Sequence, residues 1–334
     1  MMSEEKIILG FETSCDETAV SLVKGDEILV NLISSQVEEH KEFGGVVPEI
    51  ASRAHVEKIR NLLHECLLQG KIQPESIDII AATDGPGLAG SLVVGYNFAK
   101  SFAWSLNKPF YPIDHMVGHL VAPTLINKDL KPPFLSLLVS GGHTQIVLVE
   151  EWGKYQLFGQ TIDDAAGEAF DKLSRYCGFG FPGGPAIQKL GEKGNPSSVD
   201  LPRPKVKSSH DYSFSGLKTA AIYFLKELDR STKNISKEDF AASYQEAIVD
   251  TLISNFTKVL KETGVPTISG GGGVIANSRL REKMEALAEK NKLECYLPSV
   301  QLSTDNAAMI CAAANKGLIS TDTSSDIRLS SVIK

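Results

Sequence analysis

The chain contains little cysteine, and the cysteines it has are scattered. Five occur among 334 residues: Cys15, Cys66, Cys177, Cys295 and Cys311. No two of them have the C-x-x-C spacing of zinc ribbons and redox motifs. Their odd number and wide separation argue against a disulfide framework of the kind that holds small secreted domains together. We therefore expect a reduced, cytoplasmic protein.

Long hydrophobic runs are also missing. No apolar stretch approaches the roughly 18 residues that a membrane-spanning helix needs. The first residues, MMSEEK, are acidic and lead into a short strand-like run, unlike a secretory signal. We predict that the protein has no membrane partner.

Positive charge is in deficit, with 34 Lys and Arg against 41 Asp and Glu and a net charge of −7. As a whole the chain repels nucleic acid and anionic membranes, so a nucleic-acid partner must meet a local basic patch or another subunit. The segment 202–218 is one candidate patch, with aromatic rings that could stack on bases. Because it is interrupted by prolines, we favour a solvated surface loop. Its basic and aromatic residues are Arg203, Lys205, Lys207, Lys218, Tyr212 and Phe214.

The second half of the chain repeats the plan of the first. Residues 6–35 read as a strand, a tight polar turn, a second strand and a hairpin into a third. Residues 133–163 have the same order, with SGGHT in the polar turn. Residues 76–113 and 265–298 then each read as strand, glycine-rich loop, helix and strand. That is the βαβ pattern of a parallel sheet.

Two lobes of this kind are the architecture of the actin, hexokinase and Hsp70 (ASKHA) superfamily. We therefore predict an α/β, two-lobed actin/Hsp70-like fold with duplicated subdomains around a nucleotide-binding cleft. The predicted lobes are residues 1–114 and 115–334, with the functional site at the cleft between them. Cys15 and Asp16 would face residues 140–144 across it, where the backbone N–H groups of turn glycines can hold phosphate oxygens.

Two glycine-rich loops follow predicted strands. Residues 85–90 match G-x-G-x-x-G, but Asp114, the acidic residue a dinucleotide site would need, comes just before His115 and His119 and so has a competing role. We interpret this loop as a strand-to-helix turn. Residues 270–277 (GGGGVIAN) have four consecutive glycines, which cost backbone entropy and are not needed in a simple turn. We expect a nucleobase to lie against this backbone and Asn277 to bond to it.

Two helices are predicted in the second half. The segment 162–172 would place Asp164, Glu168 and Asp171 on one face, with Asp163 and Asp164 suited to its N-terminus. A solvated acidic face explains this spacing as well as a ligand contact from Asp171 does. The second helix begins after Ser236 and ends at Gly264. Its core positions are Phe240, Tyr244, Ile248, Leu252, Phe256 and Val259.

His115 and His119 lie four residues apart, directly after a predicted strand. On a helix they would share one face, so both imidazoles can reach one cation. A third ligand with an oxygen atom is needed, and Asp305 is the candidate. Two imidazoles and one oxygen ligand suit iron, zinc or manganese. Taken alone, the spacing slightly favours two buried structural histidines over a pair of ligands. Met116 replaces the Glu of an H-E-x-x-H protease, so peptide hydrolysis is not supported.

The order of these motifs resembles that of the TsaD family, which includes proteins called Gcp or YgjD and the Kae/OSGEP proteins of archaea and eukaryotes. The resemblance covers nearly the whole chain. The matching motifs are GFETSCDETAVSLV, QVEEHKEFGGVVPEIASRAHVE, DGPGLAGSLVVG, DHMVGHLVA, LVSGGHTQIV, DDAAGEAFDK, FPGGPAI, DYSFSGLKTA, GGGVIANSRLR and STDNAAM.

The resemblance implies a tRNA N6-adenosine threonylcarbamoyltransferase, an acyltransferase. Such an enzyme moves the threonylcarbamoyl group from threonylcarbamoyl-AMP to the N6 amine of the adenosine that follows the anticodon (adenosine 37). Its substrates are tRNAs that read codons beginning with A, and AMP leaves. The resemblance also implies TsaB-like and TsaE-like partner subunits.

By the same resemblance, His115, His119 and Asp305 bind one divalent metal, with Fe²⁺ preferred and Zn²⁺ as the alternative. Ser303 and Ala307 stand where the family often has Cys and Gly, but neither change removes a ligand. No general base is evident, and His143, His55 and Glu12 are candidates. The residues implied to hold the adenylate, or ATP or AMP in its place, are Leu138, Val139, Ser140, Gly141, Gly142, Asp171, Gly184 and Asn277.

The alternative is an actin-like ATPase, a chaperone or a sugar-kinase-like protein without tRNA-modifying activity. The fold alone permits it. A nucleotide ATPase that uses Mg²⁺ would not need the two histidines, because Mg²⁺ prefers oxygen ligands.

Overall fold

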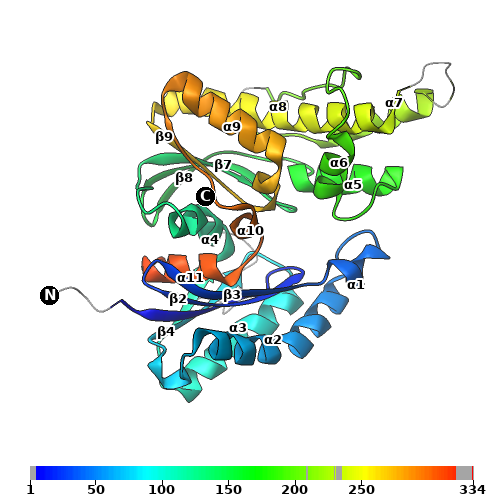
Figure 1. The fold of residues 1–334 in the computed structure, drawn as a ribbon. Helices are drawn as coiled ribbons and strands as arrows, with labels where there is room; N and C mark the ends of the chain where they lie inside the picture. The colour runs from blue at the N-terminus through cyan, green and yellow to red at the C-terminus, as the bar shows by residue number, and fades with distance from the viewer. Residues whose placement is uncertain (1–4, 208–209, 229, 231–234, 321–332, 334) are drawn as a thin grey trace. The chain divides into compact units, whose positions relative to one another are not determined.

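The computed structural model describes residues 5–207, 210–228, 230, 235–320 and 333. The chain divides into two compact units (Figure 1). Unit 1 is Met1–Lys131 with Pro298–Lys334, and unit 2 is Pro132–Leu297. These bounds differ from the predicted lobes, because the helix after Asp305 packs on the N-terminal sheet.

Unit 1 contains a five-stranded sheet with the order β3-β2-β1-β4-β5. The first three strands form an antiparallel meander, and β4 and β5 continue the sheet in parallel with β1. All seven residues of β4 are buried, as expected of a central strand covered on both faces. The strands are β1 (Ile7–Glu12), β2 (Glu17–Lys24), β3 (Glu27–Ser35), β4 (Ile79–Gly85) and β5 (Phe110–Asp114).

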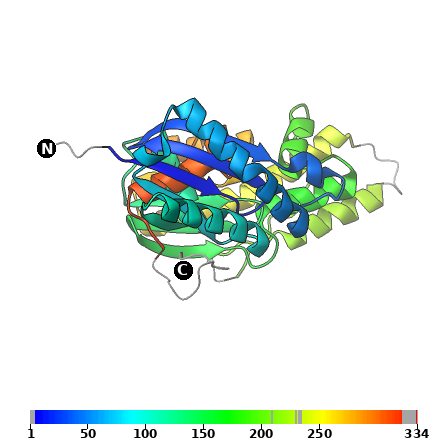
Figure 2. The ribbon, with the colours of Figure 1, turned by 90° about the horizontal axis from the view of Figure 1, so that it is seen from below.

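Helices cover both faces of this sheet. Figure 2 shows α2 and α3 side by side along it, and α11 packs on β1 and β2. Helices α2 and α3 pack against the sheet around one hydrophobic core, which includes Leu9, Phe11, Ile59 and Ile80. The helical segments are α1 (Val37–Lys41), α2 (Pro48–Gly70), η1 (Pro74–Ser76), α3 (Ala89–Ser105), α4 (His115–Val121), η2 (Ala122–Leu125), α10 (Val300–Ser303) and α11 (Ala307–Asn315).

Unit 2 repeats this topology with the strand order β10-β9-β6-β7-β8. Strands β6, β7 and β8 form the antiparallel meander, and β9 and β10 are parallel to β6. The predicted internal duplication is therefore confirmed. The strands are β6 (Phe134–Val139), β7 (Thr144–Glu151), β8 (Lys154–Gln160), β9 (Thr267–Gly271) and β10 (Glu294–Tyr296).

The helices of unit 2 pack with its sheet around one core. The prediction for α8 is confirmed: the Ser236 hydroxyl accepts from Asp239 N, and Gly264 ends the helix with φ of 63°. Its six predicted core residues are all buried. The helical segments are α5 (Ala166–Cys177), α6 (Gly183–Gly191), α7 (Ser215–Leu228), α8 (Lys237–Thr263), η3 (Gly273–Ala276) and α9 (Ser278–Asn291).

The predicted start of the acidic helix was wrong, because α5 begins at Ala166 rather than at residue 162. Asp163 instead accepts hydrogen bonds from Ser213, Phe214 N and Ser215, at the start of α7. Both oxygens of Asp164 are bound by lysines, Lys172 at 2.7 Å and Lys218 at 2.5 Å. These long-range contacts hold the two carboxylates outside the helix.

The prediction that segment 202–218 is a solvated loop was also wrong in part. Tyr212 and Phe214 are fully buried in the core, so they are not available to stack on bases. Arg203 is paired with Asp250 at 2.8 Å. Lys205 and Lys207 are exposed as expected, whereas residues 208 and 209 lie outside the described residues. Among the helices of the described chain, none has the length and hydrophobicity required to cross a membrane.

Candidate metal centre and nucleotide pocket

Helix α4 presents His115 and His119 on one face. Asp114 ends β5, and its carboxylate caps the helix by accepting from Met116 N at 2.8 Å and Val117 N at 3.1 Å. This cap starts the helix at His115, so the two imidazoles lie one turn apart. Their ring centroids are 4.7 Å apart and the rings are nearly perpendicular.

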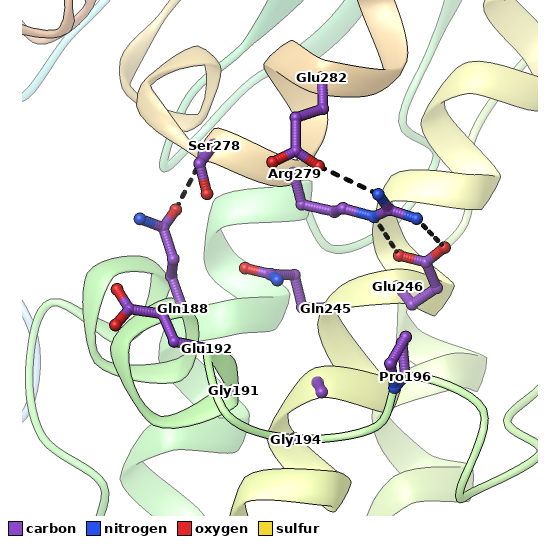
Figure 3. Close-up of a pocket in the computed structure, with 11 residues that line it drawn as sticks. Gln188, Gly191, Glu192, Gly194, Pro196, Gln245, Glu246, Ser278, Arg279 and Glu282 are labelled. Carbon is purple, nitrogen blue, oxygen red and sulfur yellow. Dashed lines mark hydrogen bonds and ion pairs between the residues drawn. The ribbon is translucent and has the colours of Figure 1, made fainter. Parts of the chain in front are cut away.

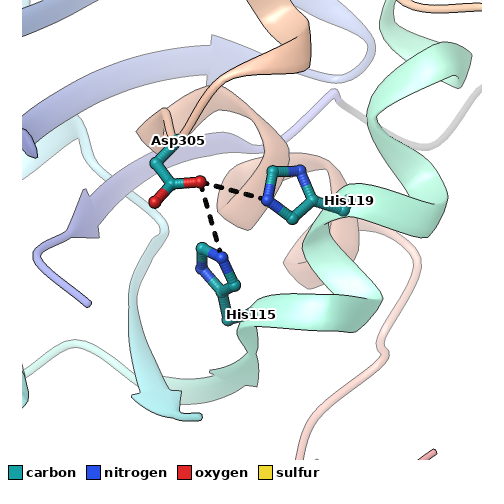
Figure 4. Close-up of side chains that lie close together, drawn as sticks. All are labelled: His115, His119 and Asp305. Atoms are coloured by element: carbon teal, nitrogen blue, oxygen red, sulfur yellow. Dashed lines mark hydrogen bonds and ion pairs between the residues drawn. The ribbon is translucent and has the colours of Figure 1, made fainter. Parts of the chain in front are cut away.

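Asp305 completes the cluster from the loop between α10 and α11 (Figure 4). Its Oδ1 lies 3.1 Å from Nε2 of His119 and 3.5 Å from Nε2 of His115. One ligand atom from each residue lies within 4.8 Å of the others. Asn306 next to it caps α11 by accepting from Met309 N, which fixes the loop. The structure therefore brings together the three residues predicted as metal ligands.

The cluster is buried on the histidine side and open on the aspartate side. The side chain of His119 is 0% exposed and that of His115 7% exposed, whereas that of Asp305 is 19% exposed. A metal held by three protein ligands on one side keeps positions free for a substrate or water. Two imidazole nitrogens and one carboxylate oxygen are the ligands that suit Fe²⁺ or Zn²⁺.

Glu12 lies behind His115, on the other side of its ring. Oε2 of Glu12 is 3.0 Å from Nδ1 of His115, and this carboxylate is fully buried. Burial alone would raise the pKa of Glu12, but attraction to His115 and hydrogen bonds from His115 and Thr83 hold it below its usual value. A carboxylate that accepts from Nδ1–H turns Nε2 toward a metal and makes it a better ligand.

The two carboxylates favour positive charge at this cluster. Burial disfavours the imidazolium form of His115, but Asp305 and Glu12 raise its pKa to about 9. Burial lowers the pKa of His119, although Asp305 opposes this. The carboxylates therefore favour positive charge at His115, whereas burial favours the neutral form of His119, the form in which a histidine binds a metal.

Nδ1 of His119 is buried and has no hydrogen-bond partner among the described residues. The nitrogens that face the ligand position are Nε2 of both rings, which lie beside Oδ1 of Asp305. Two imidazole nitrogens and one carboxylate oxygen therefore converge on one point. The donor set fits a metal.

In unit 2 the turn after β6 has an open surface. Ser140 N donates to His143 O at 2.8 Å, and His143 N donates to Ser140 Oγ at 3.1 Å, which closes the turn. No atom lies within 4 Å of where a Cβ on Gly141 or Gly142 would be. Both glycines are exposed, so a ligand can approach their backbone. Leu138 and Val139, which precede the turn, are buried in β6.

Asp171 and Gly184 lie close together at the contact of α5 and α6. Oδ1 of Asp171 accepts from Gly183 N at 2.6 Å. A Cβ on Gly183 would lie 2.5 Å from Phe170 O, so only glycine permits this approach. Gly184 has open space at the same point. This carboxylate is therefore held at the start of α6, beside an accessible backbone.

Asn277 caps α9 and also contacts α8. Its side-chain oxygen accepts from Leu280 N, and its Nδ2 donates to Oε1 of Gln245 at 2.7 Å. Packing explains two glycines of the preceding loop. A Cβ on Gly272, which has φ of 91°, would lie 2.4 Å from Val139 O, and one on Gly270 would lie 2.8 Å from Ile275. Gly273 has open space.

A cavity of about 330 Å³ lies beside Asn277, between α6, α8 and the start of α9 (Figure 3). Gln188 Oε1 accepts from Ser278 N at 3.0 Å across it. Arg279 binds Glu246 through Nε at 2.7 Å and NH2 at 2.9 Å. The lining residues are Gln188, Gly191, Glu192, Gly194, Pro196, Ala242, Gln245, Glu246, Ser278, Arg279 and Glu282.

Sequence reasoning missed the lining of this cavity. A signal existed for part of it, because Gln188 is one helical turn after Gly184 and Ser278 follows Asn277. Gln245 and Glu246 lie on α8, where the sequence pattern predicted only which apolar residues face the core. Only folding places their polar side chains beside α9.

The three candidate bases lie in different surroundings. His55 is fully buried, with Nε2 bonded to Cys15 O at 2.9 Å and Nδ1 facing Thr18 Oγ1 at 2.8 Å. Glu12 is fully buried against His115. His143 is half-buried in the glycine turn. Of the three, His143 has the most accessible side chain.

Comparison with solved structures shows the fold. Full-length HypF in its phosphate- and nucleotide-bound form gives a TM-score of 0.59 at 13% identity, over 96% of this chain and 57% of that one. The activator of 2-hydroxyisocaproyl-CoA dehydratase from Clostridium difficile gives 0.51 at 14% identity, over 93% and 95%. With the two duplicated sheets, these likenesses confirm the α/β, two-lobed actin-like fold.

Comparison with known sequences shows the family. Residues 27–312 match TsaD, tRNA N6-adenosine threonylcarbamoyltransferase. The proteins of that name from Caldicellulosiruptor saccharolyticus and Thermosipho africanus are 47% and 46% identical to this chain, over 96% and 98% of it and 95% and 98% of their own lengths. The one from Clostridioides difficile is 48% identical, over 92% of this chain and 91% of its own. The chain therefore belongs to the TsaD family of tRNA N6-adenosine threonylcarbamoyltransferases.

Proposed function

We propose that this protein transfers the threonylcarbamoyl group from threonylcarbamoyl-AMP to N6 of the adenosine that follows the anticodon, in tRNAs that read codons beginning with A. The N6 amine attacks the carbamoyl carbon, the bond from that carbon to the phosphate oxygen breaks, and the amine loses a proton. AMP leaves. Family membership supports this function, and the cluster of His115, His119 and Asp305 is the observation that carries it.

His115, His119 and Asp305 would hold one divalent metal, Fe²⁺ by preference or Zn²⁺. When bound, the metal supplies Lewis-acid stabilisation of charge on substrate oxygens. Glu12 keeps Nδ1 of His115 occupied, so that Nε2 faces the ligand position. The partial exposure of Asp305 leaves the substrate a way in.

The adenylate would bind unit 2 at the turn after β6, at Asp171 and in the cavity beside Asn277. Backbone N–H groups of Gly141 and Gly142 would bind its phosphate oxygens. The carboxylate of Asp171 can accept from a ribose hydroxyl. The cavity of about 330 Å³ beside Asn277 would take the nucleoside, and ATP or AMP would bind at the same residues.

The acceptor amine must be held in line with the carbamoyl carbon, because an exocyclic adenine amine is a weak nucleophile. An anticodon loop exposes its bases at little cost, which suits this requirement. Among the three candidate bases we retain His143, whose side chain is accessible.

The net charge of −7 means that the chain as a whole repels tRNA, so another subunit has to help bind it. We therefore also propose that TsaB-like and TsaE-like subunits join the chain and its tRNA in the cytoplasm.

The alternative of an actin-like ATPase or sugar kinase is not favoured. The solved structures of actin-like fold share 13% and 14% identity with the chain, whereas relatives at 46–48% identity carry the transferase name. Two imidazoles beside Asp305 are also poor ligands for the Mg²⁺ of an ATPase.

The test is a transfer assay with synthetic threonylcarbamoyl-AMP and a tRNA transcript that reads an A-starting codon, with partner subunits present. We expect N6-threonylcarbamoyladenosine in the digested tRNA and an equal amount of AMP. A transcript with guanosine in place of the target adenosine is the control. Nucleotide hydrolysis without any modified nucleoside would favour the ATPase alternative instead.

A further inference from the structure

The polar turn between β1 and β2, residues 13–16, is held from outside by hydrogen bonds to successive carbonyl groups. The donors come from the start of α3, from α2 and from the residue before α1. The bonds are Leu88 N to Ser14 O (2.7 Å), His55 Nε2 to Cys15 O (2.9 Å) and Gln36 N to Asp16 O (3.0 Å). The position of this turn therefore depends on groups distant in the sequence.

The turn lies directly behind the metal cluster. Ser14 Oγ is 3.2 Å from Nδ1 of His115, the same nitrogen that faces Glu12. Ser14 N also donates to Oε1 of Glu12. A shift of the turn would move both groups that orient His115, so the precision of the cluster depends on what holds the turn.

His55 is the only side chain among these three donors. The buried side chains of Gln36 and His40 are linked to it by hydrogen bonds. Gln36, His40 and His55 are all fully buried. They form a chain of hydrogen bonds that begins at the N-cap of α2 and ends at the turn. Its links are Val47 N to His40 Nδ1 (3.3 Å), His40 Nε2 to Gln36 Oε1 (3.2 Å), Gln36 Nε2 to His55 Nδ1 (3.3 Å) and His55 Nε2 to Cys15 O (2.9 Å).

The two backbone ends of the chain fix its direction. Val47 N–H can only donate, so Nδ1 of His40 carries no proton and its Nε2 carries one. Cys15 O can only accept, so Nε2 of His55 carries a proton. The Gln36 amide between them satisfies both rings in one orientation, with NH₂ toward His55. The hydroxyl of Thr18, 2.8 Å from Nδ1 of His55, donates to the same nitrogen. Both histidines are therefore neutral and protonated on Nε2.

We propose that His55 is a positioning residue of the transfer reaction, which holds the turn of residues 13–16 behind His115. Thr18 and Gln36, with His40 behind Gln36, keep it in the tautomer that donates to Cys15 O. The expected effect on transfer rests on the proposed function, whereas the chain of hydrogen bonds is independent of that function. Burial lowers the pKa of His55, which supports the neutral form.

Two substitutions of His55 separate positioning from a general loss of structure. In His55→Gln, the side-chain amide can still donate near the former Nε2. In His55→Leu, the volume is kept but the donor is lost. We expect the Leu variant to lower kcat about 10–100-fold and to weaken metal binding, with KM for tRNA unchanged, and the Gln variant to recover kcat to within about threefold. His64→Gln, an exposed position on the same helix, is the matched control and should equal wild type.

A spectroscopic measurement tests the chain apart from catalysis. Imidazole ¹⁵N shifts of the wild-type protein should show His40 and His55 as neutral Nε2–H tautomers. The double variant Thr18→Val with Gln36→Leu removes both donors to Nδ1 of His55 and should give mixed tautomers there with a folded backbone. A charged or Nδ1–H form of His55 in the wild type would overturn the proposal. So would a folded His55→Leu protein with wild-type kcat and metal affinity. If His55→Leu does not fold, unchanged His55 tautomers and kcat in the double variant of Thr18 and Gln36 would overturn it. Absence of transfer in the wild type would instead overturn the proposed function.

Discussion

The carboxylate of Glu12 lies 3.0 Å from Nδ1 of His115, while the other ring nitrogen, Nε2, faces Asp305 at 3.5 Å. A strand of the N-terminal meander thus supports a histidine on α4, which in turn faces a loop close to the C-terminal end of the described chain. Both carboxylates act on the same imidazole. This pairing explains why the cluster favours a cation although it is buried.

The support from Glu12 can be tested by Glu12→Gln. The amide can still accept from Nδ1–H, but the negative charge is lost, so the pKa of His115 should fall and metal affinity should drop about 10–100-fold. Competition with a metal chelator measures the affinity. Glu27→Gln, at an exposed position of the same sheet, is the control. Equal affinity in wild type and Glu12→Gln would show that Glu12 does not tune the site.

The ion pair beside the cavity should contribute to acid stability. Hydrogen bonds from Arg279, opposed by partial burial and aided by Lys283, lower the pKa of Glu246 to about 2, against an ordinary value of 4.5. Because the folded-state pKa is depressed, this stability is present above pH 4.5 and is lost as the pH falls toward 2.

In Glu246→Gln, the free energy of unfolding should therefore be lower by about 2 kcal/mol at pH 7, after allowance for the partly exposed Arg279, and should fall less steeply below pH 4.5. Urea unfolding at pH 7, 4.5 and 3 measures both effects. Glu282→Gln removes a more exposed partner of the same arginine and should change little. Parallel pH curves for wild type and Glu246→Gln would refute this account.

Neighbouring glycines should behave differently. Gly183→Ala places a Cβ 2.5 Å from Phe170 O, so it should lower the free energy of unfolding by about 2–4 kcal/mol. Gly184→Ala meets no atom within 4 Å and should leave the melting temperature unchanged. Its methyl group would enter the space proposed for the adenylate and raise KM several-fold. A Gly184→Ala protein with unchanged KM would remove Gly184 from the site.

Asn277 combines a helix cap with a contact to Gln245, and two substitutions separate these roles. Asn277→Asp keeps an oxygen for Leu280 N but loses the amide donor to Gln245. It should remain as stable as wild type while binding the adenylate more weakly. Asn277→Ala should lose both functions and about 1 kcal/mol of stability. Chemical unfolding and KM for the adenylate, measured on the same samples, decide between these outcomes.

Much of the fold was predictable because its signals are local. Polar turns and glycine-rich loops marked the same strand order in both halves, and Ser236 and Gly264 marked the ends of α8. The start of α5 was not predictable, since Asp163 is held by residues near position 214 and Asp164 by Lys218. Such contacts form only when distant segments pack together.

The candidate site likewise has features with a local sequence signal and features that depend on distant contacts. The spacing of His115 and His119 predicted that they share a helix face. Asp305 is 186 residues from His119, so it was only a candidate oxygen ligand until the family resemblance implied that role. Glu12 was a candidate base, but the structure places it against His115. The chain from His40 to His55 depends on a buried glutamine whose partners no local pattern indicates.

The central claim is that one metal held by His115, His119 and Asp305 is needed for threonylcarbamoyl transfer. The most direct measurement is bound metal and transfer rate on the same preparations of wild type, His115→Ala, Asp305→Ala and the control Asp129→Ala, an exposed aspartate of unit 1. We expect about one metal per chain in wild type and control, and loss of metal and of transfer together in the two site variants. Transfer that persists in a metal-free site variant would contradict the account.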